Sequence, residues 1–138
     1  GLAAVPDEVD IVCVHDAARP FASPALYDLV IAAVRAGADA AVPGVPVADT
    51  IKVVDDDGVV TSTPDRRRLV AVQTPQAFRR VALVAAHATG GEATDDAALI
   101  EANGGRVVVV AGEAANRKIT VRDDLAWARD RIAECTAR

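Results

Sequence analysis

The sequence contains no methionine, even at its first position, and few aromatic side chains. Aromatic residues make up 3% of its 138 residues, whereas hydrophobic residues together make up 51%. A core of Val, Ala, Ile and Leu suits layers of sheet and helix better than a barrel centred on aromatic rings, and the length suits one domain. Because natural chains begin with methionine, which is often removed, we also expect residues upstream of Gly1 in the parent protein.

Features of membrane, secreted and nucleic-acid-binding proteins are also scarce. The apolar runs are too short to span a bilayer, and no charged segment of a signal peptide precedes them. The formal net charge is -5 with one basic cluster, Arg66-Arg67-Arg68, which argues against binding nucleic acid through its phosphates. Cys13 and Cys135 stand far apart without metal-ligand spacing, which favours two free thiols in a reducing cytoplasm over a disulfide.

Apolar runs alternate along the chain with stretches of helical periodicity. Strands are expected at residues 11–14, 40–43, 69–74 and 107–110. Helices are expected at residues 24–36, 80–88, 94–103 and 123–135. The first helix has an N-cap and proline pair, Ser23-Pro24, and the strand at 69–74 ends before Pro75. Such alternation predicts an α/β fold, a three-layer sandwich with a mostly parallel sheet, as one domain over residues 1–138.

Residues 50–62 depart from this pattern. Residues 50–54 alternate between polar and apolar, residues 55–58 read Asp-Asp-Asp-Gly, and residues 59–62 return. Alternation on both sides of an Asp-Gly turn predicts a β-hairpin. Because a hairpin cannot lie inside a parallel sheet, we expect it to project from the body as an arm over about residues 49–66.

Asp16 is the first candidate for chemistry, since no glycine-rich phosphate loop of the usual types occurs in the sequence. It follows the apolar strand at 11–14, and ligands of open α/β sheets bind beyond the carboxyl ends of strands. Mg²⁺ bridging phosphate oxygens needs only one or two such carboxylates, and the small Ala17 and Ala18 would let a ligand approach the backbone. Alternatively, Asp16 caps the following loop or pairs with Arg19. Spacing does not choose between these interpretations.

Lys118 and Arg66 are candidate phosphate-binding cations. Lys118 stands in a loop after the strand at 107–110, where an ammonium could neutralise charge on a transferred phosphoryl group; alternatively it is a solvated lysine. Arg66 follows the hairpin and could bind a phosphate through two nitrogens, or belong to a solvated basic corner.

Three threonines stand at boundaries of the expected strands and helices: Thr50, Thr74 and Thr94. Each offers a hydroxyl and a nearby backbone N–H to a phosphate or a polyol. Thr94 precedes a helix, whose N-terminus favours an anion, although a plain N-cap is the commoner role of such a threonine.

Five segments in a fixed order now point to one family: VHDAARPF at 14–21, ADTIK at 48–52, QTPQAF at 73–78, TDDA at 94–97 and NRKIT at 116–120. The sequence resembles 2-C-methyl-D-erythritol 4-phosphate cytidylyltransferases of non-mevalonate isoprenoid biosynthesis, from about Gly1 to the last helix. The resemblance implies a cytoplasmic enzyme with a Rossmann-like nucleotidyltransferase fold, and a homodimer clasped by exchanged β-arms. It also implies the reaction, in which the polyol phosphate attacks the α-phosphate of CTP and releases pyrophosphate.

The same resemblance implies roles for the candidate residues. Asp16 would contact Mg²⁺ and the polyol, Lys118 would position the attacking phosphate, and Ala17 would lie close to the nucleotide. The remaining residues divide between subunits: Thr74 and Thr94 would bind the polyol phosphate in their own subunit, and Thr50 and Arg66 would reach the partner's site. For His15 and Arg19 we expect loop-holding roles.

One part of the family pattern is missing from the sequence. The N-terminal strand, glycine-rich loop, and the Arg and Lys that grip the triphosphate do not occur in it. We therefore expect the chain to be inactive alone and active as part of its parent. Two alternatives stay open: a pentitol-phosphate cytidylyltransferase, which Ala18 and the KIT segment at 118–120 disfavour, and a non-catalytic dimerisation or binding module.

Overall fold

A five-stranded sheet forms the centre of the structure, a computed structural model that describes residues 1–90 and 93–136. Its strands are β1 (Ile11–Val14), β2 (Ala40–Pro46), β5 (Val70–Val72), β6 (Gln76–Arg79) and β7 (Val107–Ala111). β7 pairs in parallel with one edge of β2, β5 and β6 pair antiparallel with its other edge, and β1 pairs antiparallel with β6. β1, β2 and β7 therefore run in the same direction, and their carboxyl ends reach the same edge of the sheet.

The predicted α/β sandwich is confirmed, and three of the sheet's strands share the expected common direction. The difference lies around Pro75. The sequence predicts one strand over residues 69–74, whereas the structure has two short strands, β5 and β6, on either side of Gln73-Thr74-Pro75. Pro75 has no N–H for the ladder, yet the chain resumes pairing directly after it. β6 runs against its neighbours, so the pairing is mixed.

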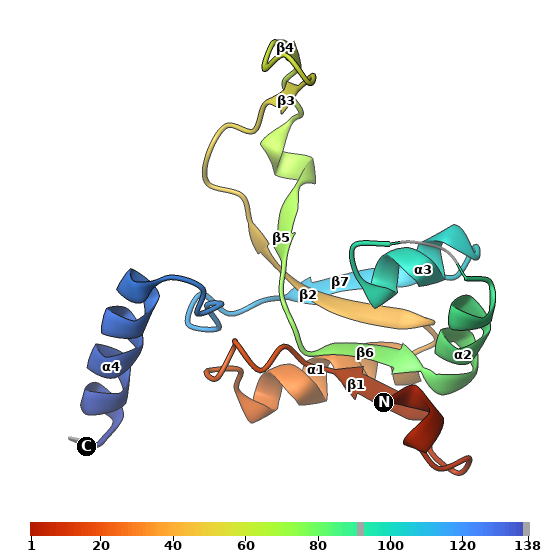
Figure 1. Cartoon of the computed structure of the whole chain (residues 1–138). Coiled ribbons are helices and arrows are strands. Elements are labelled where there is room, and N and C mark those ends of the chain that lie inside the picture. Colours follow the sequence, from red (N-terminus) through yellow and green to blue (C-terminus); the bar gives the residue numbers. More distant parts are fainter. Residues whose placement is uncertain (91–92, 137–138) are drawn as a thin grey trace.

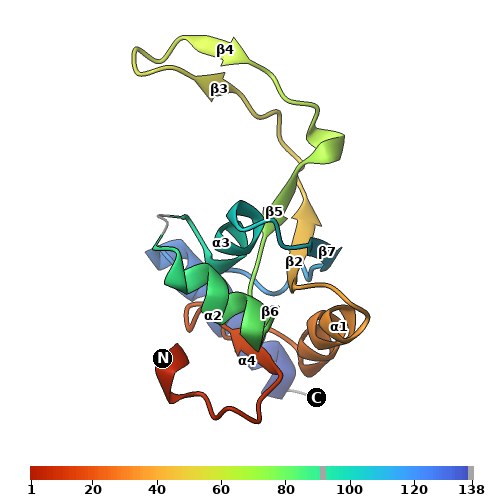
Figure 2. The same cartoon turned by 90° about the vertical axis from the view of Figure 1, so that its right-hand side faces the viewer.

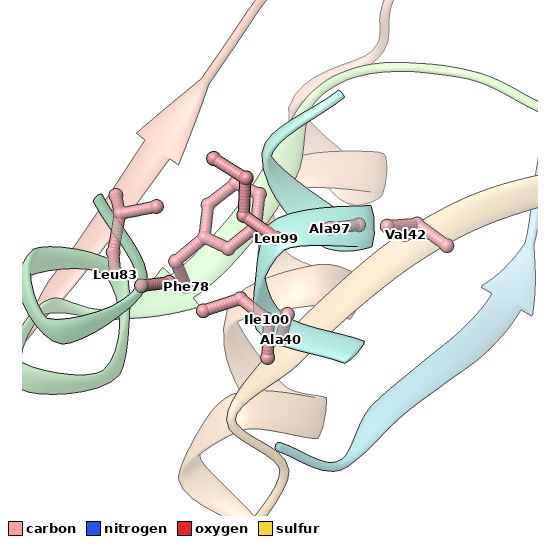
Figure 3. Close-up of a cluster of buried hydrophobic side chains, with 8 residues drawn as sticks. Ala40, Val42, Phe78, Leu83, Ala97, Leu99 and Ile100 are labelled. Carbon is pink, nitrogen blue, oxygen red and sulfur yellow. The ribbon is translucent and has the colours of Figure 1, made fainter. Parts of the chain in front are cut away.

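Helices cover both faces of the sheet. α1 (Pro24–Arg35) lies on one face, and α2 (Arg80–Ala88) and α3 (Asp96–Ala102) lie on the other (Figures 1 and 2). Successive strand residues point to opposite faces, and both sets are buried. On the α1 side the buried residues are Val30, Val34, Ala41 and Ala77. On the other side, shown in Figure 3, they include Ala40, Val42, Phe78, Leu83, Leu99 and Ile100.

The predicted hairpin is present and projects from the body as an arm (Figure 1). It contains β3 (Val53–Val54) and β4 (Val60–Ser62), paired antiparallel, and leads back through a 3-10 turn at Arg66–Arg68. Its apolar side chains are exposed: Ile51, Val53, Val54, Val59 and Val60. The arm therefore carries an apolar surface that the described part of this protomer does not cover.

The last helix, α4 (Arg122–Thr136), lies apart from the sheet (Figure 1). Trp127 of α4 packs edge-on against Phe21, with ring centroids 5.2 Å apart, and the Arg117 guanidinium lies 4.9 Å from the Trp127 ring. α4 thus contacts both the loop after β1 and the loop after β7.

A short 3-10 turn, Leu2–Ala4, begins the chain. None of the helices in the described ranges is long and apolar enough to cross a membrane.

The cysteine prediction is tested at one position. Cys13 carries a free thiol in β1, and burial raises its pKa. The side chain of Cys135 lies outside the described part of the chain.

Candidate functional site

Asp16 and Lys118 meet at the carboxyl edge of the sheet. Asp16 follows β1 and Lys118 lies in the loop after β7, two strands that run in the same direction. The Lys118 Nζ lies 2.8 Å from the Asp16 Oδ2 in an ion pair, with 51% of the lysine and 30% of the aspartate side chain exposed. The ion pair is therefore accessible to a ligand.

The Asp16 carboxylate is held in its charged form. Its Oδ2 receives the Lys118 ammonium, and its Oδ1 accepts the backbone N–H of Ala18 at 3.0 Å. The Lys118 hydrogen bond, followed by that of Ala18, holds the pKa of Asp16 below its ordinary value. The sequence left open whether Asp16 caps the following loop or pairs with Arg19. In the structure Asp16 caps the loop through the Ala18 N–H, and its ion pair is with Lys118. Arg19 instead donates to the carbonyl oxygens of Asn116 and Val72.

Thr74 lies against the loop that carries Asp16. Its Oγ1 accepts the backbone N–H of Asp16 at 2.9 Å and lies 3.1 Å from Nδ1 of His15. Thr74 occupies the irregular link between β5 and β6, so the interruption at Pro75 places its hydroxyl at the sheet edge. The structure therefore brings Thr74, Asp16 and Lys118 together from three distant parts of the chain.

A buried polar network fixes the Lys118 loop, and sequence reasoning missed it. The Gln73 amide donates to the Glu113 carbonyl at 2.8 Å and accepts the Glu113 N–H at 3.0 Å. Asn116, which is fully buried, donates from Nδ2 to the carbonyl oxygen of Thr74 at 2.8 Å. Gln73 is the first residue of the QTPQAF segment, and Asn116 is the first residue of the NRKIT segment. The signal available in the sequence for a buried polar role was therefore a polar residue that closely follows an apolar strand.

An open cavity of about 690 Å³ adjoins this site on the α3 side. Its acidic and polar lining consists of His15, Asp16, Thr74, Gln76, His87, Asp95 and Asp96. Gln76 donates to Asp95 at 2.9 Å, and His87 pairs with Asp96 at 2.9 Å. The carboxylates give this cavity many hydrogen-bond acceptors.

A second cavity, of about 630 Å³, lies on the β5 side and is lined by cations. Arg19, Arg117 and Lys118 contribute to its wall, together with Gln73. Asp16 lines the first cavity and Lys118 the second, so their ion pair joins the two. An anionic group is favoured on the Lys118 side, and a donor-rich or cationic group on the Asp16 side.

Thr94 and Ala17 are exposed next to these groups. Ala93 and Asp95, on either side of Thr94, line the first cavity. The N-cap of α3 is Asp95, whose carboxylate accepts the Ala98 N–H at 2.9 Å, so the plain N-cap role considered for Thr94 is wrong. Ala17 lies exposed in the turn after Asp16.

Thr50 and Arg66 belong to the arm segment, and none of the contacts described for this structure joins either of them to Asp16 or Lys118. Thr50 is exposed, and Arg66 donates to the carbonyl oxygen of Ala48 at the base of the arm. Arg66 also lines a cavity at the base of the arm with Pro46 and Val70.

The donor set for a metal is small. In the described ranges no group of three or more His, Cys, Asp or Glu side chains is arranged to hold a metal ion. Asp16 offers a single charged carboxylate. This suits Mg²⁺ that is held mainly by phosphate oxygens and water, and does not suit a protein-enclosed metal centre.

Comparisons with known proteins give a consistent result. The family model described as "IspD: 2-C-methyl-D-erythritol 4-phosphate cytidylyltransferase" matches residues 1–134. The 2-C-methyl-D-erythritol 4-phosphate cytidylyltransferase of Frankia casuarinae is 51% identical over 135 residues, which cover 97% of this chain and 51% of that protein. The bifunctional enzyme IspD/IspF of Nitratidesulfovibrio vulgaris is 55% identical over 130 residues, covering 91% of this chain and 33% of that protein.

Solved structures agree with the sequence comparisons. The crystal structure of 4-diphosphocytidyl-2C-methyl-D-erythritol synthase from Anaerococcus prevotii superposes with a TM-score of 0.88 at 35% sequence identity. The match covers 96% of this chain and 63% of that one. This chain therefore spans one third to about one half of the length of the two curated relatives described above.

Proposed function

Because this chain belongs to the 2-C-methyl-D-erythritol 4-phosphate cytidylyltransferase family, we propose that it forms part of a nucleotidyltransferase domain acting in non-mevalonate isoprenoid biosynthesis. The complete protein transfers CMP from CTP to 2-C-methyl-D-erythritol 4-phosphate and releases pyrophosphate. The Asp16–Lys118 ion pair at the carboxyl edge of the sheet is the observation that carries this proposal. It places one carboxylate and one ammonium where α/β folds bind their ligands.

The reaction exchanges one phosphorus–oxygen bond for another. An oxygen of the polyol phosphate bonds to the α-phosphorus of CTP, the bond to the bridging oxygen of the β-phosphate breaks, and pyrophosphate leaves with the electron pair. Two anions must approach each other, so the enzyme has to neutralise charge and align the reactants. In our proposal Lys118 positions the attacking phosphate and offsets charge growing at the α-phosphate.

Asp16 is the residue that we propose for Mg²⁺. Mg²⁺ supplies charge neutralisation on the phosphates when it is bound, and one or two protein carboxylates suffice to hold it. This role requires an ionised carboxylate, and the Lys118 hydrogen bond, which lowers the pKa of Asp16, keeps it ionised. Thr74 and Thr94 are proposed to contact the polyol phosphate from the adjoining cavity, and Ala17 to lie beside the nucleotide.

We further propose a homodimer formed through the arm. The arm exposes apolar side chains, as an interface does before it is covered, and none of the described contacts joins Thr50 or Arg66 to Asp16 or Lys118 of the same protomer. Insertion of the arm beside a partner would bring both residues to that partner's Asp16–Lys118 site. The nucleotide substrate favours a cytoplasmic location for the enzyme.

The test is an assay of the complete polypeptide that carries this chain. We expect CTP-dependent pyrophosphate release with 2-C-methyl-D-erythritol 4-phosphate, and a fall of roughly 10²–10³ in turnover for Lys118→Met. Arg129→Ala, an exposed change on α4, is the matched control and should leave turnover unchanged. Faster turnover with a pentitol phosphate would identify the other cytidylyltransferase class. No release with any polyol phosphate would support a binding module. We expect the 138-residue chain assayed alone to be inactive.

A further inference from the structure

Three contacts fix the imidazole ring of His15, beside the proposed site. The ring lies 5.6 Å from the Tyr27 ring, at an angle of 52° between planes. Its Nε2 lies 3.1 Å from the carbonyl oxygen of Arg19, and its Nδ1 lies 3.1 Å from Oγ1 of Thr74. Both nitrogens therefore have partners, and the ring has little freedom to rotate or flip.

For the neutral form of the ring, these partners determine which atoms carry the hydrogens. A carbonyl oxygen can only accept, so the Nε2 of His15 must donate to Arg19. The Nδ1 of the neutral ring is then an acceptor, and the Thr74 hydroxyl donates its single hydrogen to it. The same Oγ1 accepts the backbone N–H of Asp16 at 2.9 Å. One lone pair of the Thr74 hydroxyl remains for a ligand.

We propose that His15 is a positioning residue that makes the Thr74 hydroxyl an acceptor towards the substrate while that hydroxyl holds the backbone of Asp16. The inference rests on the proposed function and deepens it. A phosphate oxygen at neutral pH is itself an acceptor, so Thr74 is poorly suited to bind the phosphate. A hydroxyl group of the polyol can donate to it. His15 therefore sets which part of the polyol phosphate lies against Thr74.

The charges around the two cavities agree with this orientation. Carboxylates of Asp16, Asp95 and Asp96 line the cavity next to Thr74, where hydroxyl donors are favoured and a phosphate is not. Arg19, Arg117 and Lys118 line the other cavity, where a phosphate is favoured. The polyol would point towards Thr74, and its phosphate towards Lys118.

Two substitutions of His15 separate its two hydrogen bonds. The amide of His15→Asn reaches about as far as Nδ1 and can accept from Thr74, but it is too short for the Arg19 carbonyl. The amide of His15→Gln reaches about as far as Nε2 and can donate to Arg19, but it leaves the Thr74 hydroxyl hydrogen uncommitted. In the complete polypeptide we expect His15→Gln to raise the KM for the polyol phosphate about tenfold, because one hydrogen bond is lost, and His15→Asn to change it less than about threefold. The KM for CTP should be unchanged in both.

A second background tests whether the effect passes through Thr74. In Thr74→Val protein, which has no hydroxyl to orient, His15→Gln should cause no further rise in the KM for the polyol phosphate. Equal losses in His15→Asn and His15→Gln, or a larger loss in His15→Asn, would overturn the proposal, because His15 would then act through Arg19 as a loop support. A further rise in the Thr74→Val background would overturn it as well.

A spectroscopic measurement tests the hydrogen assignment without any turnover. Two-bond ¹⁵N–¹H NMR spectra of the protein distinguish which ring nitrogen of neutral His15 carries its hydrogen. We expect hydrogen on Nε2, and hydrogen on Nδ1 would overturn the proposal. If the Nε2 form is found but no polyol phosphate is turned over, the proposed function has failed and the assignment of His15 has not.

Discussion

The backbone N–H of Ile119 donates to the carbonyl oxygen of Ala18 across 2.8 Å. This bond ties the loop after β7 to the loop after β1, one residue away from Lys118 on one side and two from Asp16 on the other. The two charged side chains are therefore held together by their backbones as well as by their own attraction. Such preorganisation would keep the shape of the site when Lys118, in its proposed role, leaves Asp16 to bind a substrate phosphate.

Removal of Lys118 should raise the pKa of Asp16. The Lys118 hydrogen bond is the largest cause of the lowered pKa, so Lys118→Met moves it towards the ordinary value for an aspartate, about 3.9. NMR titration of the Asp16 carboxyl carbon measures the change. Lys52→Met on the arm is the control, because Lys52 bonds to Thr63 and not to this site. An unchanged titration in Lys118→Met would show that the ion pair does not form in solution.

The same shift predicts the pH dependence of stability. Because the pKa of Asp16 is lower in the folded than in the unfolded protein, the stabilisation is fully present above the unfolded value and is lost as pH falls through the folded value. The Lys118→Met variant should therefore lose less stability on acidification than the unsubstituted protein does. Urea unfolding at a series of pH values below about 5 measures this difference.

The core on the α2 and α3 side should be sensitive to truncation. Leu83 of α2 is 2% exposed and packs in the cluster of Figure 3, whereas Val81 of the same helix is 67% exposed. Leu83→Ala should lower the free energy of unfolding by about 2–5 kcal/mol through lost burial and a residual cavity. Val81→Ala should change it by less than about 0.5 kcal/mol. Comparable losses in urea unfolding would mean that α2 does not pack as the structure shows.

Asn116 should link stability to activity. Its buried side-chain Nδ2 donates to the backbone carbonyl oxygen of Thr74, and its backbone carbonyl oxygen accepts from the Arg19 guanidinium. Asn116→Ala leaves the Thr74 carbonyl without this donor, so we expect a loss of about 1–3 kcal/mol in the free energy of unfolding. We also expect reduced turnover in the complete polypeptide, because Asn116 anchors the loop after β7, which carries Lys118 two residues later. Asn103→Ala, on the exposed end of α3, should leave turnover unaltered.

Local patterns in the sequence predicted the parts of the fold that have strong periodicity. β1, β2, β7 and the arm follow from apolar runs and an Asp-Gly turn, and α1 follows from its Ser23-Pro24 start. β6 was missed because Pro75 looked like a strand end, and the residues after it carry little alternation. Its pairing with β1 and β2 is a tertiary effect that overrides the local signal.

The candidate site was predictable to a similar extent. Asp16 and Lys118 could be placed at one sheet edge because each follows a strand of the same direction. The roles of Gln73, Asn116 and His15 depend on partners that are distant in sequence. No spacing rule reports such hydrogen bonds, so these residues became visible only in the folded chain.

Mixed dimers test whether Arg66 acts across subunits. If each site combines its own Lys118 with the partner's Arg66, neither Arg66→Ala nor Lys118→Met protein is active alone. In a mixed dimer, the site with an intact Lys118 also receives an intact Arg66. Half of randomly formed dimers are mixed, and one of the two sites in each mixed dimer is complete. Co-expression of the two variants should therefore restore about a quarter of the turnover per site of the unsubstituted protein.

The control for this experiment is a pair of variants that cannot complement. Lys118→Met and Asp16→Asn form such a pair, because Asp16 and Lys118 belong to the site of the same subunit. When the two variants are co-expressed, every site lacks one of these residues, so mixing should restore nothing. If Arg66 served its own subunit, the Arg66→Ala and Lys118→Met mixture would stay equally inactive, because every site would lack one of the two groups. The described partner of the Arg66 side chain is the Ala48 carbonyl oxygen, and none of the described contacts joins Arg66 to Lys118, so restored turnover is the outcome that the proposed exchange of arms predicts.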